Sequence, residues 1–340
     1  MANSLRIDEC KYPGEWNSFV RSHGTVHHLF EWSYVNQETF GCGCVNLGCW
    51  AGSELVAIYP YIVRGMWPLR WFVSPTDFGG GPIGDPSAVR RLMQEVHRRA
   101  RRQLITMNVV RCCEANTHNL DELGYHITER RDLVVDINRP LEQIWESFPS
   151  KLRNSIKKSN SQGITVHEGG ADDLDAYIDL VRNHSGKIGY RPRSEEFLRA
   201  LFKHLDTTLL IATWQRHMVG GCLYINFNGR ANAINAARDP DKAKLRIGEA
   251  LHWAGITYCC EKGYSEYDFM SRNDNFVSNG KTHVYPSHAS LHRFKKNWRP
   301  REVSAYDSEY VYFRTGLFAR KLLAGLRNNI HSITSRLKNI

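Results

Sequence analysis

Long apolar runs are scarce in this chain. The longest, residues 55–63, is nine residues with Pro60 inside it, far short of the roughly 20 that a membrane-spanning helix needs. The first ten residues, MANSLRIDEC, include acidic side chains and no apolar stretch of the kind that forms a secretory signal. We therefore expect a soluble, cytoplasmic protein.

Familiar catalytic and metal-binding signatures are missing as well. The sequence has no G-x-S-x-G, no H-E-x-x-H and no G-x-x-x-x-G-K-[ST], and the triple glycine 79–81 lacks the Lys and Ser/Thr of a phosphate loop. Those glycines indicate either a tight turn or backbone that lies close to a ligand. Nine cysteines are present, an odd number without an export signal, so we expect reduced thiols. Cys42, Cys44 and Cys49 lack a second spaced pair, and we predict neither a metal site nor a permanently bound cofactor.

The composition is that of a globular protein with a basic surface. The chain has 340 residues, enough for about two domains at roughly 150 residues each. Apolar residues make up 42% and charged residues 24%, which excludes disordered and collagen-like classes. Lys and Arg number 45 against 35 Asp and Glu, a net charge of +10. This excess predicts an anionic partner without saying which.

One order of elements occurs twice along the chain. Helices at 16–20 and 29–38, a hairpin at 44–50 and 55–63, a helix from 86 to about 104 and strands at 105–113 and 132–137 form the first series. Helices at 172–183 and 194–205, strands at 209–214, 219–227 and 231–237, a helix at 245–262 and a strand at 267–270 form the second. The dipeptide Asn228-Gly229 is a strong hairpin signal between two of these strands. We predict an α+β protein built from two related halves.

Basic residues gather in four clusters, and each could simply be a solvated face. One lies within 151–158, one decorates the helix after Asp85, and one lies within 293–301, interleaved with Phe294 and Trp298. Cations that alternate with aromatic rings suit phosphate contact combined with stacking. The fourth cluster is the tail, which has no acidic residue from Tyr310 onward and mixes cations with apolar residues. We expect a basic amphipathic helix there, either docked on the body of the protein or lying on an anionic membrane surface.

Several short motifs, in order along the chain, resemble the Fem-type aminoacyltransferases, which have a GNAT-like acyltransferase fold. These motifs are Phe30-Glu31-Trp32, the turn 81–85, Trp145 with 151–158 and 163–166, Tyr267-Asp268-Phe269, and Phe294-Lys295 ahead of Trp298. The resemblance covers roughly residues 15 to 306 and implies two tandem GNAT-like domains facing a shared cleft. We place them at 1–140 and 141–310, followed by the amphipathic helix at 311–340. The coiled-coil arm of the larger members is absent.

The resemblance also implies roles for individual residues. Transfer of an aminoacyl group to an amine would place Lys295, Phe294 and Asp268 at the reacting centre, with Lys295 stabilising the oxyanion. The other implied positions are Asp85, Lys187, Tyr190 and Arg191 for the acceptor, and Arg153, Lys157, Lys158, Arg293 and Lys296 for phosphates of the donor.

Three functions remain open at this point. The first is amide-bond formation from aminoacyl-tRNA to an amine of a peptidoglycan precursor, a small molecule or a peptide. The second is transfer from acyl-CoA, although Leu245 and Glu249 depart from the Q/R-x-x-G-x-G/A pyrophosphate loop that Gly248 and Ala250 fit. The third is non-catalytic binding of nucleic acid or a membrane surface through the basic clusters.

Overall fold

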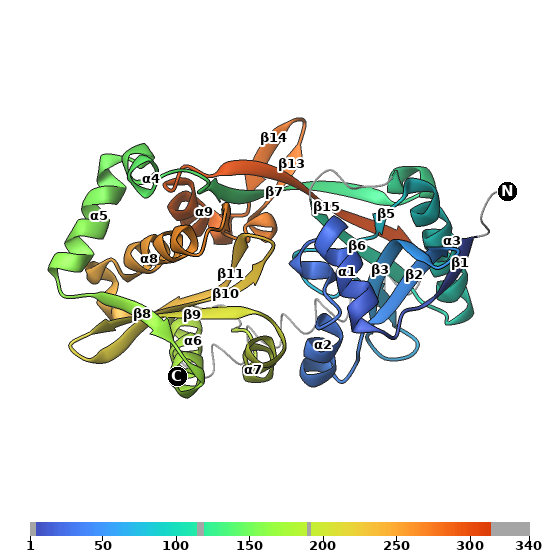
Figure 1. Ribbon diagram of the computed structural model, residues 1–340, viewed down its shortest axis with the longest axis horizontal. Coiled ribbons are helices and arrows are strands. Elements are labelled where there is room, and N and C mark those ends of the chain that lie inside the picture. Colours follow the sequence, from blue (N-terminus) through green and yellow to red (C-terminus); the bar gives the residue numbers. More distant parts are fainter. Residues whose placement is uncertain (1–4, 114–118, 189–191, 314–340) are drawn as a thin grey trace.

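A computed structural model describes residues 5–113, 119–188 and 192–313 (Figure 1). The first half contains β1 (Leu5–Glu9), α1 (Pro13–His23), α2 (Trp32–Phe40), β2 (Val45–Ala51), β3 (Glu54–Arg64), β4 (Trp71–Val73), β5 (Ile83–Gly84), α3 (Pro86–Arg102), β6 (Met107–Cys113) and β7 (His126–Asp136). The second half contains α4 (Leu141–Ser147), α5 (Ser150–Ser161), β8 (Thr165–Gly169), α6 (Leu174–Ile188), α7 (Glu195–His204), β9 (Thr207–Trp214), β10 (His217–Phe227), β11 (Arg230–Arg238), α8 (Ile247–Glu261), β12 (Glu266–Asp268), β13 (Asn275–Ser278), β14 (Lys281–Val284), α9 (Ala289–Lys296) and β15 (Arg301–Val311).

Local sequence signals explain most of these elements. Helix α3 begins where Asp85 accepts hydrogen bonds from the backbone N–H groups of Ser87 and Ala88, with Pro86 at the first helical position. Its apolar side chains recur at helical spacing, and Leu92 and Val96 are fully buried against the sheet. The hairpin predicted at Asn228-Gly229 joins β10 to β11, with both residues at positive φ.

A single mixed sheet runs through both halves. Its strand order is β1-β2-β3-β4-β6-β15-β7-β12-β11-β10-β9-β8, with β5 attached to β3. Most neighbours are antiparallel, whereas β4–β6 and β11–β12 are parallel. Helix α3 covers the sheet of the first half, while α8 on one face and α6 with α7 on the other cover that of the second half (Figure 1). The predicted α+β class with tandem GNAT-like halves is confirmed.

Strand β15 joins the two halves. Its residues 305–311 pair with β6 and its residues 301–309 pair with β7, so a strand from the end of the described chain lies between two strands of the first half. The buried Arg272 strengthens this junction: it donates to the carbonyls of Phe78, Cys112 and Tyr306 and to the carboxylate of Asp307. The halves therefore share one hydrogen-bonded framework.

The predicted and observed elements differ mainly at strands. The prediction missed strands β1, β4, β5, β8, β13, β14 and β15 and helices α4, α5 and α9. Strand β15, rather than the strand at 267–270, is the last described strand. Because β15 extends to Val311, the predicted C-terminal helix does not begin at 311; residues 314–340 lie outside the described part of the chain. The domain boundaries at 140 and 310 remain predictions.

Within the described residues, no helix is both long and apolar enough to cross a membrane. The same residues contain no cluster of three His, Cys, Asp or Glu side chains that could hold a metal ion. All nine cysteines are free thiols.

Candidate functional site

The site begins where β11 and β12 run side by side. These parallel strands pair over only three positions, from Arg230 opposite Glu266 to Asn232 opposite Asp268. Alternation along the strands turns Tyr267 toward α8 and sends Arg230, Glu266 and Asp268 to the other face. One face of this short pairing is therefore apolar, and the opposite face carries a group of charged side chains.

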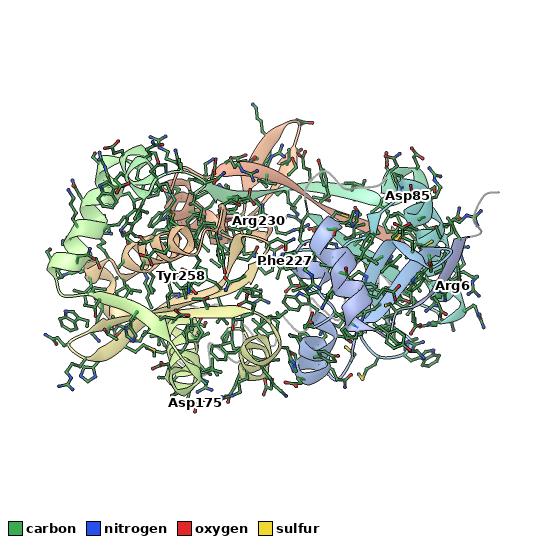
Figure 2. All side chains as sticks on the ribbon, in the orientation of Figure 1. Arg6, Asp85, Asp175, Phe227, Arg230 and Tyr258 are labelled. Atoms are coloured by element: carbon green, nitrogen blue, oxygen red, sulfur yellow. The ribbon has the colours of Figure 1, made fainter. Side chains whose placement is uncertain are left out.

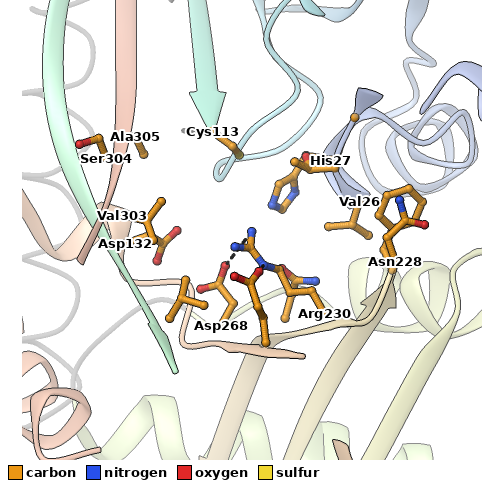
Figure 3. Close-up of a pocket in the computed structure, with 16 residues that line it drawn as sticks. Val26, His27, Cys113, Asp132, Asn228, Arg230, Asp268, Val303, Ser304 and Ala305 are labelled. Atoms are coloured by element: carbon orange, nitrogen blue, oxygen red, sulfur yellow. Dashed lines mark hydrogen bonds and ion pairs between the residues drawn. The ribbon is translucent and has the colours of Figure 1, made fainter. Parts of the chain in front are cut away.

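Those charged side chains line a pocket of about 190 Å³ between the two halves (Figure 3). The first half contributes the turn at residues 24–27, Cys113 of β6, and Asp132 and Val134 of β7. The hairpin end at residues 227–228 and residues 303–305 of β15 complete the lining. Figure 2 shows Arg230 near the junction of the two halves. The predicted shared cleft corresponds to this pocket.

Two carboxyl groups meet in the pocket. Asp268 is almost fully buried, and Asp132 lies within hydrogen-bonding range of it. Burial, reinforced by the negative charge of Asp132, raises the pKa of Asp268 far above the usual range of an aspartate, although Arg230 opposes the shift. Backbone N–H groups fix both carboxyls: Met270 donates to Asp268 at 2.7 Å and Ser271 donates to Asp132 at 2.5 Å. The pair can hold one proton between its two members.

The other ionisable side chains around this pair add little net charge: Arg230 is paired with Glu266, and His27 is neutral. Arg230 forms an ion pair with Glu266 (Nε to Oε2, 2.6 Å) and approaches Asp268 at 3.9 Å (Figure 3). His27 is buried, which together with its neighbour His28 lowers its pKa, so the ring is neutral near pH 7. With Arg230 and Glu266 cancelling, the two aspartates leave the pocket with a net negative charge. A ligand that brings an ammonium group fits such a site.

The triple glycine packs against His27 and Cys113, two residues that line the pocket. A Cβ at Gly79 would lie 2.5 Å from Cys113 Sγ and 2.7 Å from the His27 ring, and one at Gly80 would lie 2.8 Å from the His27 carbonyl oxygen. Gly80 has φ +95°. Of the two predicted roles, the positive φ of Gly80 fits the tight turn, and the three glycines do not themselves line the pocket.

The opposite face of β12 carries the Phe294-Lys295 motif of α9. The half-buried Phe294 ring covers the first turn of α8, where a Cβ on Gly248 would lie 3.5 Å from it. His252 packs beside Phe294 and its Nδ1 is 2.6 Å from the hydroxyl of Tyr267. Burial and the charge of Lys295 lower the pKa of His252 to about 3, so this imidazole is neutral. An aromatic surface thus lies at the amino-terminal end of α8.

Lys295 is buried and paired. Its Nζ donates to Asp274 Oδ2 at 2.9 Å, and both side chains are at most 10% exposed. Asp274 follows β12 by a few residues, and its backbone carbonyl accepts from Tyr285 N–H. Asp274 fixes the position of this ammonium and balances much of its charge, and Lys295 does not line the pocket, so its role at the oxyanion remains a prediction.

The predicted phosphate-binding cations lie on two helices outside the pocket. Lys157 and Lys158 are exposed on α5, and the half-buried Arg153 on the same helix has a buried Nε with no hydrogen-bond partner among the described residues. On α9, Arg293 is exposed and Lys296 pairs with Glu302 at 2.7 Å. Their role in holding a donor remains a prediction.

The predicted acceptor residues are not brought together. Asp85 caps α3 on the far side of the first half (Figure 2). Lys187 is exposed at the end of α6 and pairs with Asp241. Neither residue lines the pocket. Tyr190 and Arg191 lie outside the described residues.

Sequence reasoning missed three pocket residues: His27, Asp132 and Arg230. Arg230 immediately follows the Asn228-Gly229 turn, and Asp132 begins the predicted strand 132–137, so both positions were marked by secondary-structure signals. Their convergence depends on the pairing of β7 with β12, which joins residues about 130 positions apart.

The fold is that of GNAT proteins. A family model described as an acetyltransferase (GNAT) domain matches residues 146–277, which include β11, β12 and Asp268. No curated protein matches the chain. Solved structures of the same fold cover nearly the whole chain.

Among them is FemX, at 14% identity over 91% of this chain and 98% of that one, with a TM-score of 0.72. L-PGS from Bacillus licheniformis is similar at 14% identity over 88% of this chain and 92% of that one, with a TM-score of 0.61. A tandem GNAT protein from the clavulanic acid biosynthesis pathway has 9% identity over 91% and 98%, with a TM-score of 0.57. These likenesses confirm, at the level of the fold, the resemblance to Fem-type GNAT proteins.

Proposed function

We propose that this protein is an acyltransferase that forms an amide bond by moving an aminoacyl group from an ester donor to an acceptor amine. The observation that carries the proposal is the Asp132–Asp268 pair, set in a pocket between the halves where the β11–β12 pairing ends. The fold is that of GNAT acyltransferases, and the pocket offers what an amine acceptor needs: negative charge to attract its ammonium form and a group to take its proton.

The chemistry requires no covalent enzyme intermediate. An ammonium group enters the pocket and gives one proton to the Asp132–Asp268 pair. The neutral amine attacks the donor carbonyl, and a C–N bond forms as the negative charge moves to the carbonyl oxygen. The C–O bond then breaks, and the leaving alkoxide takes up the second proton, which the attacking nitrogen loses as the neutral amide forms. Lys295 does not line the pocket, so its proposed part is to favour the oxyanion through its charge at longer range, while Asp274 keeps the ammonium in place.

Aminoacyl-tRNA is the donor that we favour. The amino-terminal end of α8 faces the Phe294 ring and presents free backbone N–H groups, which suit a phosphate or a ribose. Glu249 in the first turn is a poor neighbour for the pyrophosphate of CoA; it lies 3.8 Å from Arg246. Arg153, Lys157 and Lys158 would contact further phosphates of a polynucleotide. The acceptor class is an amine on a peptidoglycan precursor, a small molecule or a peptide.

The donor can be identified directly. The purified full chain is incubated with a pool of amines and either tRNA charged with labelled amino acids or labelled acetyl-CoA, and amide products are detected by mass. We expect product only with charged tRNA, and ribonuclease treatment should abolish it. Product from acetyl-CoA alone would replace the donor assignment with the CoA alternative. No turnover with either donor, together with salt-sensitive binding of tRNA, would support the non-catalytic function.

Site variants test the catalytic assignment. Asp268→Asn removes the proton acceptor and should lower kcat by about 10²-fold or more, the usual order for such a group. Lys295→Met removes a charge that acts from outside the pocket and should lower kcat by less, about 10-fold. Asp175→Asn and Lys203→Met, both exposed side chains outside the pocket, are the matched controls. A Lys295→Met protein that folds normally and keeps full activity would remove Lys295 from the mechanism.

A further inference from the structure

Large apolar side chains are exposed at one end of the first half. Met66 is 84% exposed and Trp67 is 71% exposed, both in the turn between β3 and β4. Leu104, between α3 and β6, and Phe313, just after β15, are also exposed. Burying side chains of this kind is favourable, and exposed apolar groups that gather in one place mark an interaction surface.

Backbone hydrogen bonds bring these three chain segments together. Thr106 is the centre: its N–H donates to the Arg70 carbonyl, and its own carbonyl accepts from the N–H groups of Tyr312 and Phe313. The guanidinium of Arg70 donates to the carbonyl of Gln103, the residue before Leu104. The β3–β4 turn, the α3–β6 turn and the end of β15 thus form one surface, which we call the apolar tip; its exposed members are Met66, Trp67, Leu104 and Phe313.

Only positive charges accompany the apolar tip within these segments. Residues 55–76 contain Arg64 and Arg70 and no acidic residue. Residues 96–113 also lack acids and contribute the exposed Arg101 and Arg102. From Tyr310 to the end of the chain the sequence again has no Asp or Glu. Arg64 lies over the exposed Phe40 ring, 3.3 Å from its centroid, which adds another cation backed by an aromatic ring.

We infer that the apolar tip docks the protein on an anionic lipid bilayer. Tryptophan is enriched at the boundary between headgroups and acyl chains, so Trp67 would lie there, while Met66, Leu104 and Phe313 would enter the outer part of the hydrocarbon. The arginines around them would meet lipid phosphates. The aliphatic members Met66 and Leu104, on segments without acidic residues, favour a bilayer over RNA, because aliphatic side chains gain little against a solvated sugar-phosphate backbone.

Docking in this way leaves the pocket open. Ala305 of β15 lines the pocket, and Val311 lies six residues further along the same strand, next to the apolar tip. At about 3.3 Å per residue the two are separated by about 20 Å. The inference does not depend on the proposed acyl transfer, since it concerns a surface away from the pocket.

Vesicle co-sedimentation of the full chain tests this inference. The probes are vesicles of phosphatidylcholine alone and of equal parts phosphatidylcholine and phosphatidylglycerol. We expect binding to the anionic vesicles that weakens as salt is added. The double variant M66S/W67S and the single variant R102Q, at an exposed arginine, should each reduce the bound fraction several-fold. Tyr12→Ser is the matched control, since Tyr12 is 73% exposed but lies outside the tip.

Each variant keeps residues 314–340, so the basic tail is the same in all of them. Equal vesicle binding by the wild type, M66S/W67S and R102Q would overturn the inference and assign any binding to other parts of the chain. Equal binding to neutral and anionic vesicles, or none to either, would overturn it as well. Loss of tRNA binding in the variants with no change in vesicle binding would make the apolar tip an RNA surface instead. Thermal unfolding of each variant confirms that it is folded.

Discussion

At the scale of single residues, the behaviour of Asp268 depends on what surrounds its carboxyl. Burial and the charge of Asp132 raise its pKa, so protonation is favoured at pH values where an ordinary aspartate, with a pKa of about 4, is ionised. A proton acceptor must be ionised to work. Activity should therefore fall as pH is lowered through the raised pKa.

The variant Asp132→Asn tests this pH dependence, because it should shift the acidic limb of activity in a known direction. Replacing Asp132 removes a like charge, so the pKa of Asp268 should move down toward its usual range. The acidic limb of the kcat/KM profile should then shift to lower pH, while asparagine can still accept the hydrogen bond from Ser271. The measurement is a pH–rate profile of both proteins, with Asp175→Asn as the control. An acidic limb at the same pH in both would show that Asp268 does not govern it.

Asp274 acts on the reaction through Lys295. The ion pair is buried, so Asp274→Asn leaves the ammonium without its matching charge and free to change position. We expect kcat to fall by about 10-fold or more with little change in KM, because the oxyanion interaction exists mainly in the transition state. Steady-state kinetics separate this result from a purely structural effect, which would lower thermal stability and leave kcat of the folded fraction intact.

At the scale of elements, two glycines of the chain are expected to respond in opposite ways. Gly84 ends β5 at φ +126°, and a Cβ there would lie 2.2 Å from the Val56 carbonyl oxygen, so Gly84→Ala should destabilise the fold by about 1–3 kcal/mol or more. Gly248, in the first turn of α8, has ordinary φ and room for a Cβ against Phe294. Gly248→Ala should leave stability unchanged or higher by up to about 1 kcal/mol.

The kinetics of Gly248→Ala test whether the donor binds at the amino-terminal end of α8. If the donor binds against the amino-terminal end of α8, Gly248→Ala should raise KM for the donor several-fold without loss of stability. Unchanged kinetics would leave Gly248 as an ordinary helix residue. Thermal unfolding and donor titrations of the same two variants provide both measurements.

Elements with strong local signals could be predicted from the sequence. The Asp85-Pro86 start of α3, the helical spacing of its apolar residues and the Asn228-Gly229 turn are each decided within a few residues. Strand β15 could not be predicted in this way, because its burial depends on β6 and β7, nearly 200 residues earlier. Its sequence, REVSAYDSEYV, is largely polar, since charged side chains such as Asp307 are matched by Arg130 and Arg272 from other elements.

The same distinction applies to the site. Asp268, Phe294 and Lys295 came from a resemblance carried by short contiguous motifs, and the structure places Asp268 in the pocket. Asp132 had no such motif: its partner becomes visible only when β7 pairs with β12. The pocket is thus a product of long-range strand pairing, which no local pattern encodes.

At the scale of the whole molecule, the two related halves share one sheet. The last described strand, β15, completes the sheet between β6 and β7, and its residues 303–305 also line the pocket. The pocket therefore depends on the same strand that joins the halves. Relative movement of the halves would break backbone hydrogen bonds of β15, so we expect the geometry around Asp132 and Asp268 to be rigid.

Because the two halves share one sheet, we expect them to unfold together in one transition. Calorimetry of the full chain should give a single transition, and a fragment of residues 1–140 should not fold alone, since it lacks β15 between β6 and β7. Arg272→Ala should lower the free energy of unfolding by about 3–5 kcal/mol, the usual cost of removing one partner of a buried ion pair, because it also frees the carbonyls of Phe78, Cys112 and Tyr306. Arg238→Ala, outside this junction, is the control. Two separate transitions in the wild type, or a stably folded 1–140 fragment, would show that β15 does not couple the halves.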